Sequence, residues 1–577
     1  MVHPDPQQPL LSTPAYRAPE TMSATTRHLS AAPYLDVDFA NRVIREILES
    51  ERKAVPPSFG FDLDPVVRHS LRARRLLLLR YALVTLVLVV GFCLSPIATI
   101  TWLLLCGAVV AFRSRVLGGL PPQVRTGIVT AGAFALVCLG GYWLLQTMSG
   151  DLGDLLFSSQ DGYYDYGGRD FPGTGLGFTF LDFLYPVLLT VAMAAVLFLS
   201  RRHALGVITT ELAPGAPAAA PRTANPRVER RLAIVAGMQR GNLSVHDREP
   251  FLGAGRIWHG WDFAITLKPV EGTERIRLDG AALNRRVADA IVALRSPALG
   301  DGEKVPNVFV VPYVVANGWR RTDDPLIDPN TKAPYTMASP ETLAAIEGSP
   351  QGGMRYYLRA VVPAHGKEIS TPGQRPVLPG QDSGVAVTAF VHLAVEGGML
   401  YAEFVATVMP EVLRYYQLGD ILRPERVPGY AAMDTLRSFF RENLFAPLWL
   451  LQIGWDAIRL TGRMAKSSQE AEELRYHDYG ADLSVREEGA EYPVYKFLSQ
   501  LDAAKYISLL DKAVVEEVLD VLDEAGVDTG EFRAKAANVS IDFSTKTFTG
   551  GQQIFGNNNR INQTNFPKAP RSGGSGG

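Results

Sequence analysis

The chain has 577 residues, of which 47% are hydrophobic and 20% are charged, and its formal net charge is −2. At about 100–200 residues per domain, this length predicts several structural units instead of one compact domain. The near-neutral charge excludes a strongly basic protein that coats nucleic acid, so we expect no nucleic-acid partner. The three cysteines all lie in apolar stretches without zinc spacing, which supports neither a disulfide framework nor a structural metal.

The N-terminal region divides into a polar tail and an amphipathic helix. Residues 1–34 are rich in Pro, Ser, Thr and Ala, which predicts a disordered cytoplasmic tail. Residues 35–75 then combine a helix over 35–55 with a basic flank, and we expect this helix to pack against a cytoplasmic domain. The apolar face of the helix carries Phe39, Val43, Ile47 and Leu48.

Most of the apolar excess lies in 76–200, which predicts a membrane domain of four transmembrane helices. The uncharged run 81–112 would reach about 48 Å as one helix, and a hydrocarbon core is only about 30 Å thick. We therefore expect two helices that break at Ser95-Pro96. Arginines flank the inner ends and aspartates fill the connection 148–177, so the positive-inside rule places both termini in the cytoplasm. The expected spans are 76–95, 97–112, 127–146 and 178–199.

Asp182 is the one carboxylate that borders a predicted span. An ionisable residue within a bilayer is a functional candidate, here for a proton or cation site. Its place at the outer end of the span favours the other interpretation, an interface residue in contact with water.

A Pro/Ala-rich linker over 201–226 precedes a predicted α+β domain over 227–430, with a mostly antiparallel sheet. The sequence Glu396-Gly397-Gly398 separates two strand patterns and predicts a hairpin turn. A helix is expected over 278–296. The expected strands are 261–268, 306–316, 354–362, 385–395 and 399–408.

A helical segment is predicted over 431–538, and residues 444–455 within it carry no charge. This run is too short for a confident span. One interpretation is a buried helix of the cytoplasmic domain, and the other is an interfacial helix in contact with lipid headgroups. The candidate membrane-interface residues are Trp449, Trp455, Arg441 and Arg459.

The tail 539–577 is rich in Asn, Gln and Gly, which is typical of either a disordered or a β-prone segment. The stretch 556–561 resembles the RHIM-type amyloid motif, with Asn three residues and Ile five residues after a Gly. It departs from that motif because Ile554 stands where a Gln is expected. The resemblance implies self-assembly through Ile554, Phe555, Gly556, Asn559 and Ile561.

No phosphate loop, zinc-protease motif, nucleophile elbow or kinase signature is present, so no catalytic, cofactor-binding or metal-ligating residue is predicted. Segments 241–262 and 477–488 resemble parts of uncharacterised actinobacterial multi-pass membrane proteins with a large cytoplasmic domain. This resemblance implies a bacterial plasma-membrane setting and no particular activity.

The leading hypothesis for function is a non-enzymatic membrane protein whose cytoplasmic domain binds a protein partner or transduces a signal. The lipid bilayer is then one partner, and the tail is a candidate for homo-oligomer formation. The alternative is a membrane-tethered enzyme with its site in 227–430. A deep pocket with convergent ionisable side chains would favour the enzyme, whereas a flat surface would favour the binding module.

Overall fold

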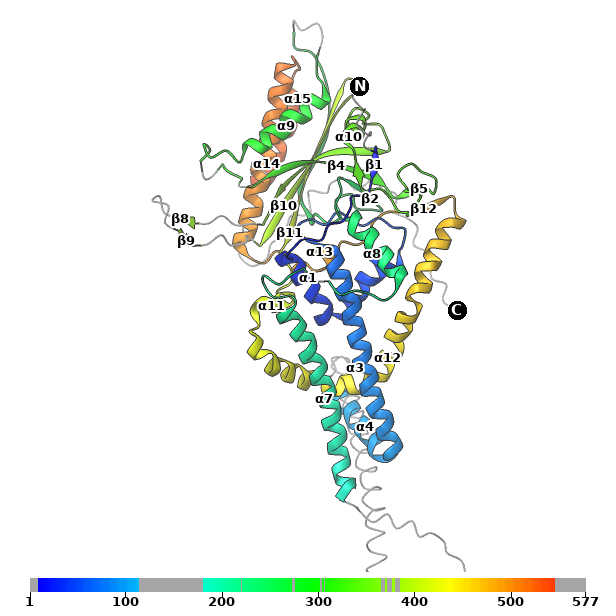
Figure 1. Cartoon of the computed structure of the whole chain (residues 1–577). Helices are drawn as coiled ribbons and strands as arrows, with labels where there is room; N and C mark the ends of the chain where they lie inside the picture. Colours follow the sequence, from blue (N-terminus) through cyan, green and yellow to red (C-terminus); the bar gives the residue numbers. More distant parts are fainter. Residues whose placement is uncertain are drawn as a thin grey trace, which may run out of the picture.

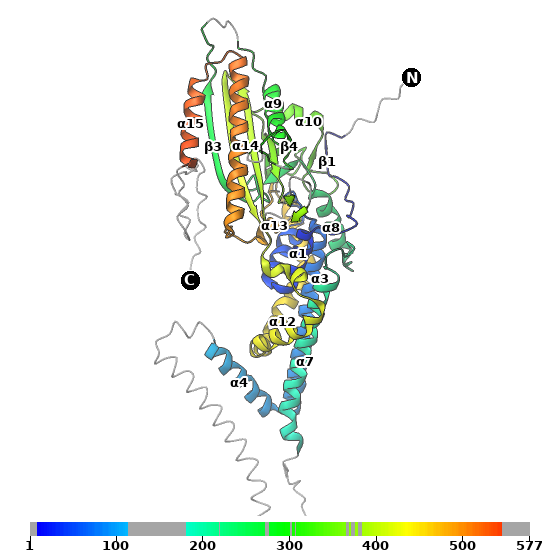
Figure 2. The same cartoon turned by 90° about the vertical axis from the view of Figure 1, so that its left-hand side faces the viewer.

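A computed structural model shows a domain built on a β-sheet, from which a group of long helices projects in one direction (Figures 1 and 2). We call the first part the sheet domain and the second part, formed by α3, α4, α7 and α12, the helical bundle. The structure describes residues 9–113, 180–218, 220–271, 276–300, 303–305, 307–364, 369–370, 376–378 and 384–544.

The main sheet has six strands in the order β2-β4-β7-β10-β11-β3, and every neighbouring pair except β2–β4 is antiparallel. The mostly antiparallel sheet predicted from the sequence is therefore confirmed. Gly397 and Gly398 both have positive φ at the β10–β11 turn, as a two-residue hairpin requires. The strands are β2 (Leu243–His246), β3 (Arg256–Thr266), β4 (Phe309–Asn317), β7 (Met354–Val362), β10 (Val385–Glu396) and β11 (Met399–Pro410).

Three amphipathic helices cover one face of this sheet: α9 (Gly280–Ala293), α14 (Phe497–Glu524) and α15 (Gly530–Ser544) (Figure 2). Their buried side chains recur every three or four residues, which is the spacing of one helix face. On the opposite face, Phe251 stacks on Phe390 at a ring-centroid distance of 4.3 Å. Both sides of the central strands are thus in a hydrophobic core.

Short elements pair segments that are distant in sequence. Strand β1 (Leu11–Ser12) pairs with β6 (Met337–Ala338), and β5 (Trp319–Arg321) pairs with β12 (Tyr476–Asp478). The remaining short elements are α10 (Pro340–Glu347), β8 (Ile369–Ser370), β9 (Pro376–Leu378), the 3₁₀ helix Arg414–Gln417, α11 (Leu418–Ile421), the 3₁₀ helix Pro424–Arg426 and α13 (Val485–Glu488).

The N-terminal region differs from the disordered tail expected over 1–34. Its described part, from residue 9 onward, contains the helix α1 (Ala24–Leu35), in which Ser23 caps the N-terminus and Leu29 is fully buried. Helix α2 (Val37–Val43) and a π-helix (Ile44–Glu49) follow. The composition was misleading because Pro, Ser, Thr and Ala serve here as caps and small packing residues. The predicted apolar face of the next helix is buried, at Phe39, Val43, Ile47 and Leu48.

Helices α3 and α7 each have one end in the sheet domain and the other end far from it (Figure 1). Helix α3 (Leu63–Leu94) begins before the predicted span, and α4 (Pro96–Arg113) follows a break at Ser95. Helix α7 (Phe180–Thr210) also extends past its predicted end and into the expected linker. By length and composition, two described segments could cross a membrane, Leu63–Leu94 and Val187–Thr210, while the apolar stretch Thr99–Ala111 is shorter. The predicted span 127–146 lies outside the described residues.

Helix α12 (Val427–Glu473) passes along the base of the sheet domain and contacts α3, α4 and α7 (Figure 1). Pro447 lies inside it, where the ring removes one hydrogen bond of the helix. Helix α8 (Pro226–Met238) packs on the first half of α3. At the other end of the chain, α15 includes residues 539–544, which the sequence assigned to the β-prone tail.

Candidate functional site

The segments 241–262 and 477–488, which carry the sequence resemblance, lie side by side in the structure. His246 at the end of β2 forms a parallel bridge with Ala481, and the Ala481 amide donates to the Val245 carbonyl at 3.0 Å. Gly480 is essential to this approach, because a Cβ there would lie 2.3 Å from the Asp247 nitrogen. The contact places Asp247 next to the acidic residues of the later segment.

A cavity of about 740 Å³ opens at this contact, and its lining is mainly polar and acidic. Sequence reasoning missed the site because its residues come from separate regions of the chain and match no local motif. The lining residues are Lys53, Asp247, Arg248, Glu249, Leu252, Arg256, Asp478, Ala481, Asp482, Leu483, Ser484, Glu487, Glu488 and Tyr492.

Three carboxylates converge in this cavity. One oxygen each from Asp247, Asp478 and Asp482 lie within 4.8 Å of one another, a donor set that suits a hard divalent cation. The Lys53 ammonium also contacts Asp482, and it lies 3.3 Å from Asp478. Burial alone would lower the pKa of Lys53, but its hydrogen bonds and charge interactions with Asp482 and Asp478 outweigh burial and raise it. Lys53 therefore supplies positive charge where a cation would bind.

Arg231 holds the Lys53 segment in place. It is fully buried on α8 and donates to the backbone carbonyls of Ile47, Ser50 and Lys53, each at 3.1 Å. Burial lowers its pKa to about 10, so the side chain keeps its charge at neutral pH. These carbonyls lie within and just after the π-helix Ile44–Glu49, so Arg231 fixes the segment that carries Lys53.

Glu487 forms another wall of the cavity. Its carboxylate accepts hydrogen bonds from the amides of Gly253, at 2.6 Å, and Gly255, at 3.0 Å. Burial raises the pKa of Glu487, and the two amides oppose this shift without reversing it. Both glycines have positive φ, which lets the loop direct two successive donors to one oxygen.

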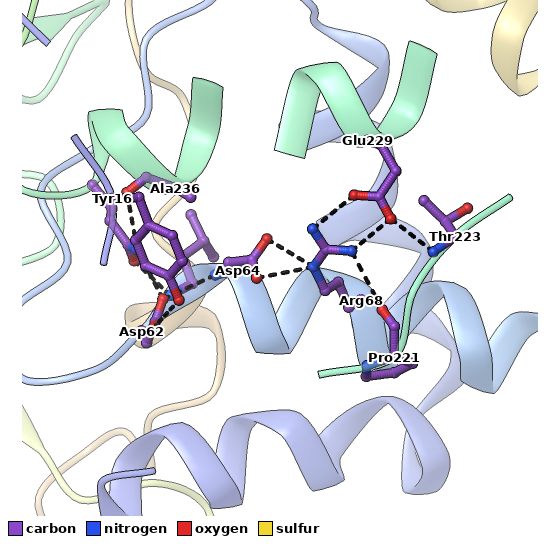
Figure 3. Close-up of polar contacts among 10 residues, drawn as sticks. Tyr16, Asp62, Asp64, Arg68, Pro221, Thr223, Glu229 and Ala236 are labelled. Carbon is purple, nitrogen blue, oxygen red and sulfur yellow. Dashed lines mark hydrogen bonds and ion pairs between the residues drawn. The ribbon is translucent and has the colours of Figure 1, made fainter. Parts of the chain in front are cut away.

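A polar network joins the first turns of α3 to the N-terminal segment and to α8 (Figure 3). The Tyr16 hydroxyl donates to Asp62 at 2.6 Å, and Asp62 also accepts from the Gln239 amide at 2.8 Å. Arg68 on α3 donates to Asp64 at 2.9 Å and to Glu229 on α8 at 2.7 and 2.8 Å. These bonds fix α3 to the sheet domain.

A buried ion triad lies farther along, where α3, α7 and α12 meet. Glu442 of α12 accepts a hydrogen bond from Arg201 of α7, and it lies 3.6 Å from the Arg80 guanidinium of α3. All three side chains are about nine-tenths buried. Removing one member of such a group leaves an uncompensated buried charge, so the triad favours a single arrangement of the three helices.

The four predicted membrane-interface residues form two aromatic–guanidinium pairs on α12. The Arg459 guanidinium lies 3.9 Å from the Trp455 ring centroid, and that of Arg441 lies 5.8 Å from the Trp449 centroid. Trp449 packs on Tyr81 of α3 at a ring-centroid distance of 5.3 Å, whereas Trp455 is more than half exposed. Helix α12 is thus buried on one side and exposes an apolar stripe on the other: Met433, Leu436, Leu448, Leu451, Trp455 and Ile458.

The other predicted site residues can be placed only in part. Asp182 lies in the first turn of α7, and nothing further is described for its side chain. The candidate self-assembly residues Ile554, Phe555, Gly556, Asn559 and Ile561 lie outside the described residues.

The family model of the AbeC-like domain matches residues 260–561, more than half of the chain. The chain belongs to the AbeC-like domain family. The match covers most of the main sheet together with α12 and α14, and it leaves out α3, α7 and α8. No curated protein and no solved structure matches the chain.

Proposed function

We propose that the chain is an integral protein of a bacterial plasma membrane that holds its AbeC-like domain at the cytoplasmic surface. In this proposal four helices cross the membrane, and the domain binds a protein partner and transmits that event to the helices. The observation that carries the proposal is the continuity of α3, which runs unbroken from the core of the sheet domain into the helical bundle.

The exposure pattern of α3 supports the membrane assignment. Leu63, Val66 and Val67 in its first turns are buried in the core of the sheet domain. Leu86 and Leu94 in its second half are 56% and 70% exposed, on a helix with no charge beyond Arg80. Contiguous apolar surface of this kind is unfavourable in water, and lipid chains would cover it.

Helix α12 supports the position of the domain at the membrane surface. Its exposed apolar stripe begins and ends near arginines, and the two Trp–Arg pairs have the chemistry of the headgroup region. If α12 lies at the membrane surface, the uncharged run 444–455 contacts lipid without crossing the membrane. The number of spans then stays at four, and both termini stay on the cytoplasmic side.

The rigid junction supports signal transmission. Arg68 connects α3 to α8, and Glu442 connects α12 to α3 and α7. A displacement of the sheet domain would therefore move the attached helices as well. The Pro/Ala-rich segment also packs along α3, where Arg75 donates to Thr223 at 2.9 Å. A bound partner at the domain could therefore bias the packing of the bundle.

The experiment that tests the proposal expresses the full chain in bacteria and washes the membranes with alkaline carbonate. We expect the protein to stay in the pellet. We also expect a C-terminal reporter that works only in the cytoplasm to be active, and one that works only outside the membrane to be inactive. Release by carbonate would overturn the membrane assignment, and a reporter on the outer side would overturn the topology.

We also propose homo-oligomer formation through the tail, on the strength of its Asn/Gln-rich sequence alone. A peptide of residues 545–566 should then form thioflavin-positive fibres, and the same peptide with Ile554→Asp and Ile561→Asp should not. Absence of fibres from the first peptide after prolonged incubation would remove this part of the proposal.

A membrane-tethered enzyme is the second candidate, because the acidic cavity between segments 241–262 and 477–488 carries convergent ionisable groups. Asp247, Asp478 and Asp482 could bind a substrate cation or a metal-linked anion once Lys53 moves aside. The distinguishing measurement is Mn²⁺ binding to the detergent-solubilised chain. An Asp478→Asn/Asp482→Asn variant should lose any binding that the wild type shows, and no binding to the wild type would favour the binding module.

A further inference from the structure

A second cavity, of about 500 Å³, opens where α1 and α2 meet the helical bundle. Its polar part is formed by the buried ion triad and its neighbours, and its apolar part by side chains of α3, α7 and α12. Five aromatic residues also line it: Tyr34, Tyr81, Tyr415, Tyr430 and Trp449. A cavity that combines charged, aromatic and aliphatic walls suits an amphiphile better than a purely polar solute.

Most charges in the cavity are already paired with one another. Arg80 and Arg201 share Glu442, and a second nitrogen of Arg201 lies 3.2 Å from Asp434. Two charged side chains remain, Arg441 on α12 and Asp38 in the first turn of α2. Within the part of the chain that the structure describes, neither of them has an ion-pair partner, and both are exposed.

The balance of charge selects the class of ligand. Three arginines and three carboxylates line the cavity, so a ligand with one positive and one negative group would leave it neutral. A phosphate would pair with the Arg441 guanidinium, as charge-assisted hydrogen bonds to arginine favour. An ammonium group would pair with Asp38 and be stabilised by the aromatic walls.

We propose that this cavity binds the headgroup of a zwitterionic phospholipid, with its phosphate at Arg441 and its ammonium at Asp38. The proposal rests on the proposed function, because it places the cavity at the level of the lipid headgroups. Leu77 and Ile453 also line this cavity, and the exposed apolar stripe of α12 includes Leu451 and Trp455, on either side of Ile453 in the sequence. The acyl chains would follow this surface toward the bilayer.

The test uses the full chain, purified in detergent and stripped of lipid, with binding followed by native mass spectrometry and thermal unfolding. The probes are phosphatidylethanolamine, anionic phosphatidylglycerol and soluble glycerophosphoethanolamine. We expect phosphatidylethanolamine to bind at least tenfold more tightly than the other two. Equal binding of phosphatidylglycerol would contradict the proposal that the ligand is zwitterionic. Equal binding of the soluble headgroup would contradict the proposal that the ligand is a lipid.

Variants on one helix provide the matched comparison. Arg441→Gln should weaken phosphatidylethanolamine binding about tenfold, whereas Arg437→Gln, an exposed arginine one turn earlier and outside the cavity, should not change it. Asp38→Asn should reduce the preference over phosphatidylglycerol. Equal affinities of the two arginine variants would overturn the site.

Carbonate extraction of the same variants separates this proposal from the membrane assignment. Retention of Arg441→Gln in the membrane together with loss of lipid binding supports the headgroup site. A wild-type chain that carbonate releases would instead count against the proposed function, while the binding measurement in detergent would still decide the chemistry of the cavity.

Discussion

At the scale of single residues, two charged side chains near the acidic cavity, Arg231 and Glu487, are stabilised by backbone groups. Arg231 ends on three carbonyl oxygens, and Glu487 accepts from two glycine amides. Backbone groups carry only partial charges, so burying Arg231 or Glu487 costs free energy. The hydrogen bonds that offset this cost form only when the partner loop keeps its conformation. Loss of either side chain therefore affects a loop that lines the acidic cavity.

Replacement of the buried guanidinium gives the first prediction. Arg231→Met should lower the free energy of unfolding by about 3 kcal/mol, because carbonyls in a buried loop lose their donors. The neighbouring Arg230→Met, at an exposed position of the same helix, should change it by less than about 0.5 kcal/mol. Chemical denaturation in detergent measures both, and equal midpoints would contradict the role given to Arg231.

The second prediction concerns pH. Because burial raises the pKa of Glu487 above its ordinary value of 4.5, the folded state binds its proton more readily than the unfolded state. The charged form thus costs stability at neutral pH, and this cost fades as the pH falls through the raised pKa. Glu487→Gln, which can still accept both amide hydrogen bonds, should unfold at a higher temperature than wild type at pH 7.5.

The advantage of Glu487→Gln should shrink as the pH falls through the raised pKa and disappear below the ordinary value of 4.5, where the wild-type carboxyl is protonated in both states. Glu425→Gln, at an exposed carboxylate outside the cavity, serves as the control and should track wild type throughout. A difference that stays constant between pH 7.5 and 4.5 would show that the charge of Glu487 is not the cause.

At the scale of elements, α12 is buried on one face and exposes apolar side chains on the other. Ala446 and Ile453 are buried against the other long helices, while Leu451 and Ile458 are more than 70% exposed. A hydrophobic run of this length cannot reveal which of its faces meets protein and which meets another phase. That assignment depends on α3 and α7, whose positions follow from distant contacts.

The proposed interfacial position of α12 gives the third prediction. In a background with the native cysteines changed to alanine, spin labels at Leu451→Cys and Ile458→Cys should be more accessible to oxygen than to a nickel chelate in lipid vesicles. Oxygen partitions into lipid, whereas the chelate stays in water. A label at Lys466→Cys, on an exposed polar stretch of the same helix, should show the reverse order. Equal behaviour of all three labels would place the stripe in water.

The regular elements of the sheet domain were largely predictable, whereas the candidate sites were not. Period-two strands such as 354–362 and the hairpin at Gly397-Gly398 carry local signals, and the structure confirms them. The meeting of Asp247 with Asp478 depends on a parallel bridge between segments far apart in sequence, for which no local pattern exists. The only hint was the resemblance of the two segments to the same set of proteins.

At the scale of the whole molecule, the N-terminal region, the start of α3 and the sheet domain form one hydrophobic core. Phe39, Leu63 and Val66 belong to the same buried cluster as Leu232 and Val314. Each large side chain removed from such a core costs about 2–5 kcal/mol, and a whole domain is stable by only about 5–15 kcal/mol. The sheet domain therefore depends on segments that lie outside the region of the family match.

The fourth prediction follows from this shared core. A fragment of residues 227–577 expressed alone should be insoluble or lack a cooperative thermal transition by circular dichroism. Co-expression of residues 9–75 should restore solubility, because it returns the missing part of the core. A fragment of 227–577 that unfolds cooperatively by itself would contradict the dependence.

Contacts between residues that are far apart in the sequence also determine when the fold can be completed during synthesis. Arg52, just before α3, donates to Ser468, which lies 416 residues later in the sequence. At about 5–20 residues per second, a ribosome needs roughly 20–80 s to synthesise that interval. Until then, the early segments lack the part of their shared core that Leu460, Met464 and Val485 supply. The core shared by the N-terminal region and the sheet domain can therefore be completed only late in synthesis.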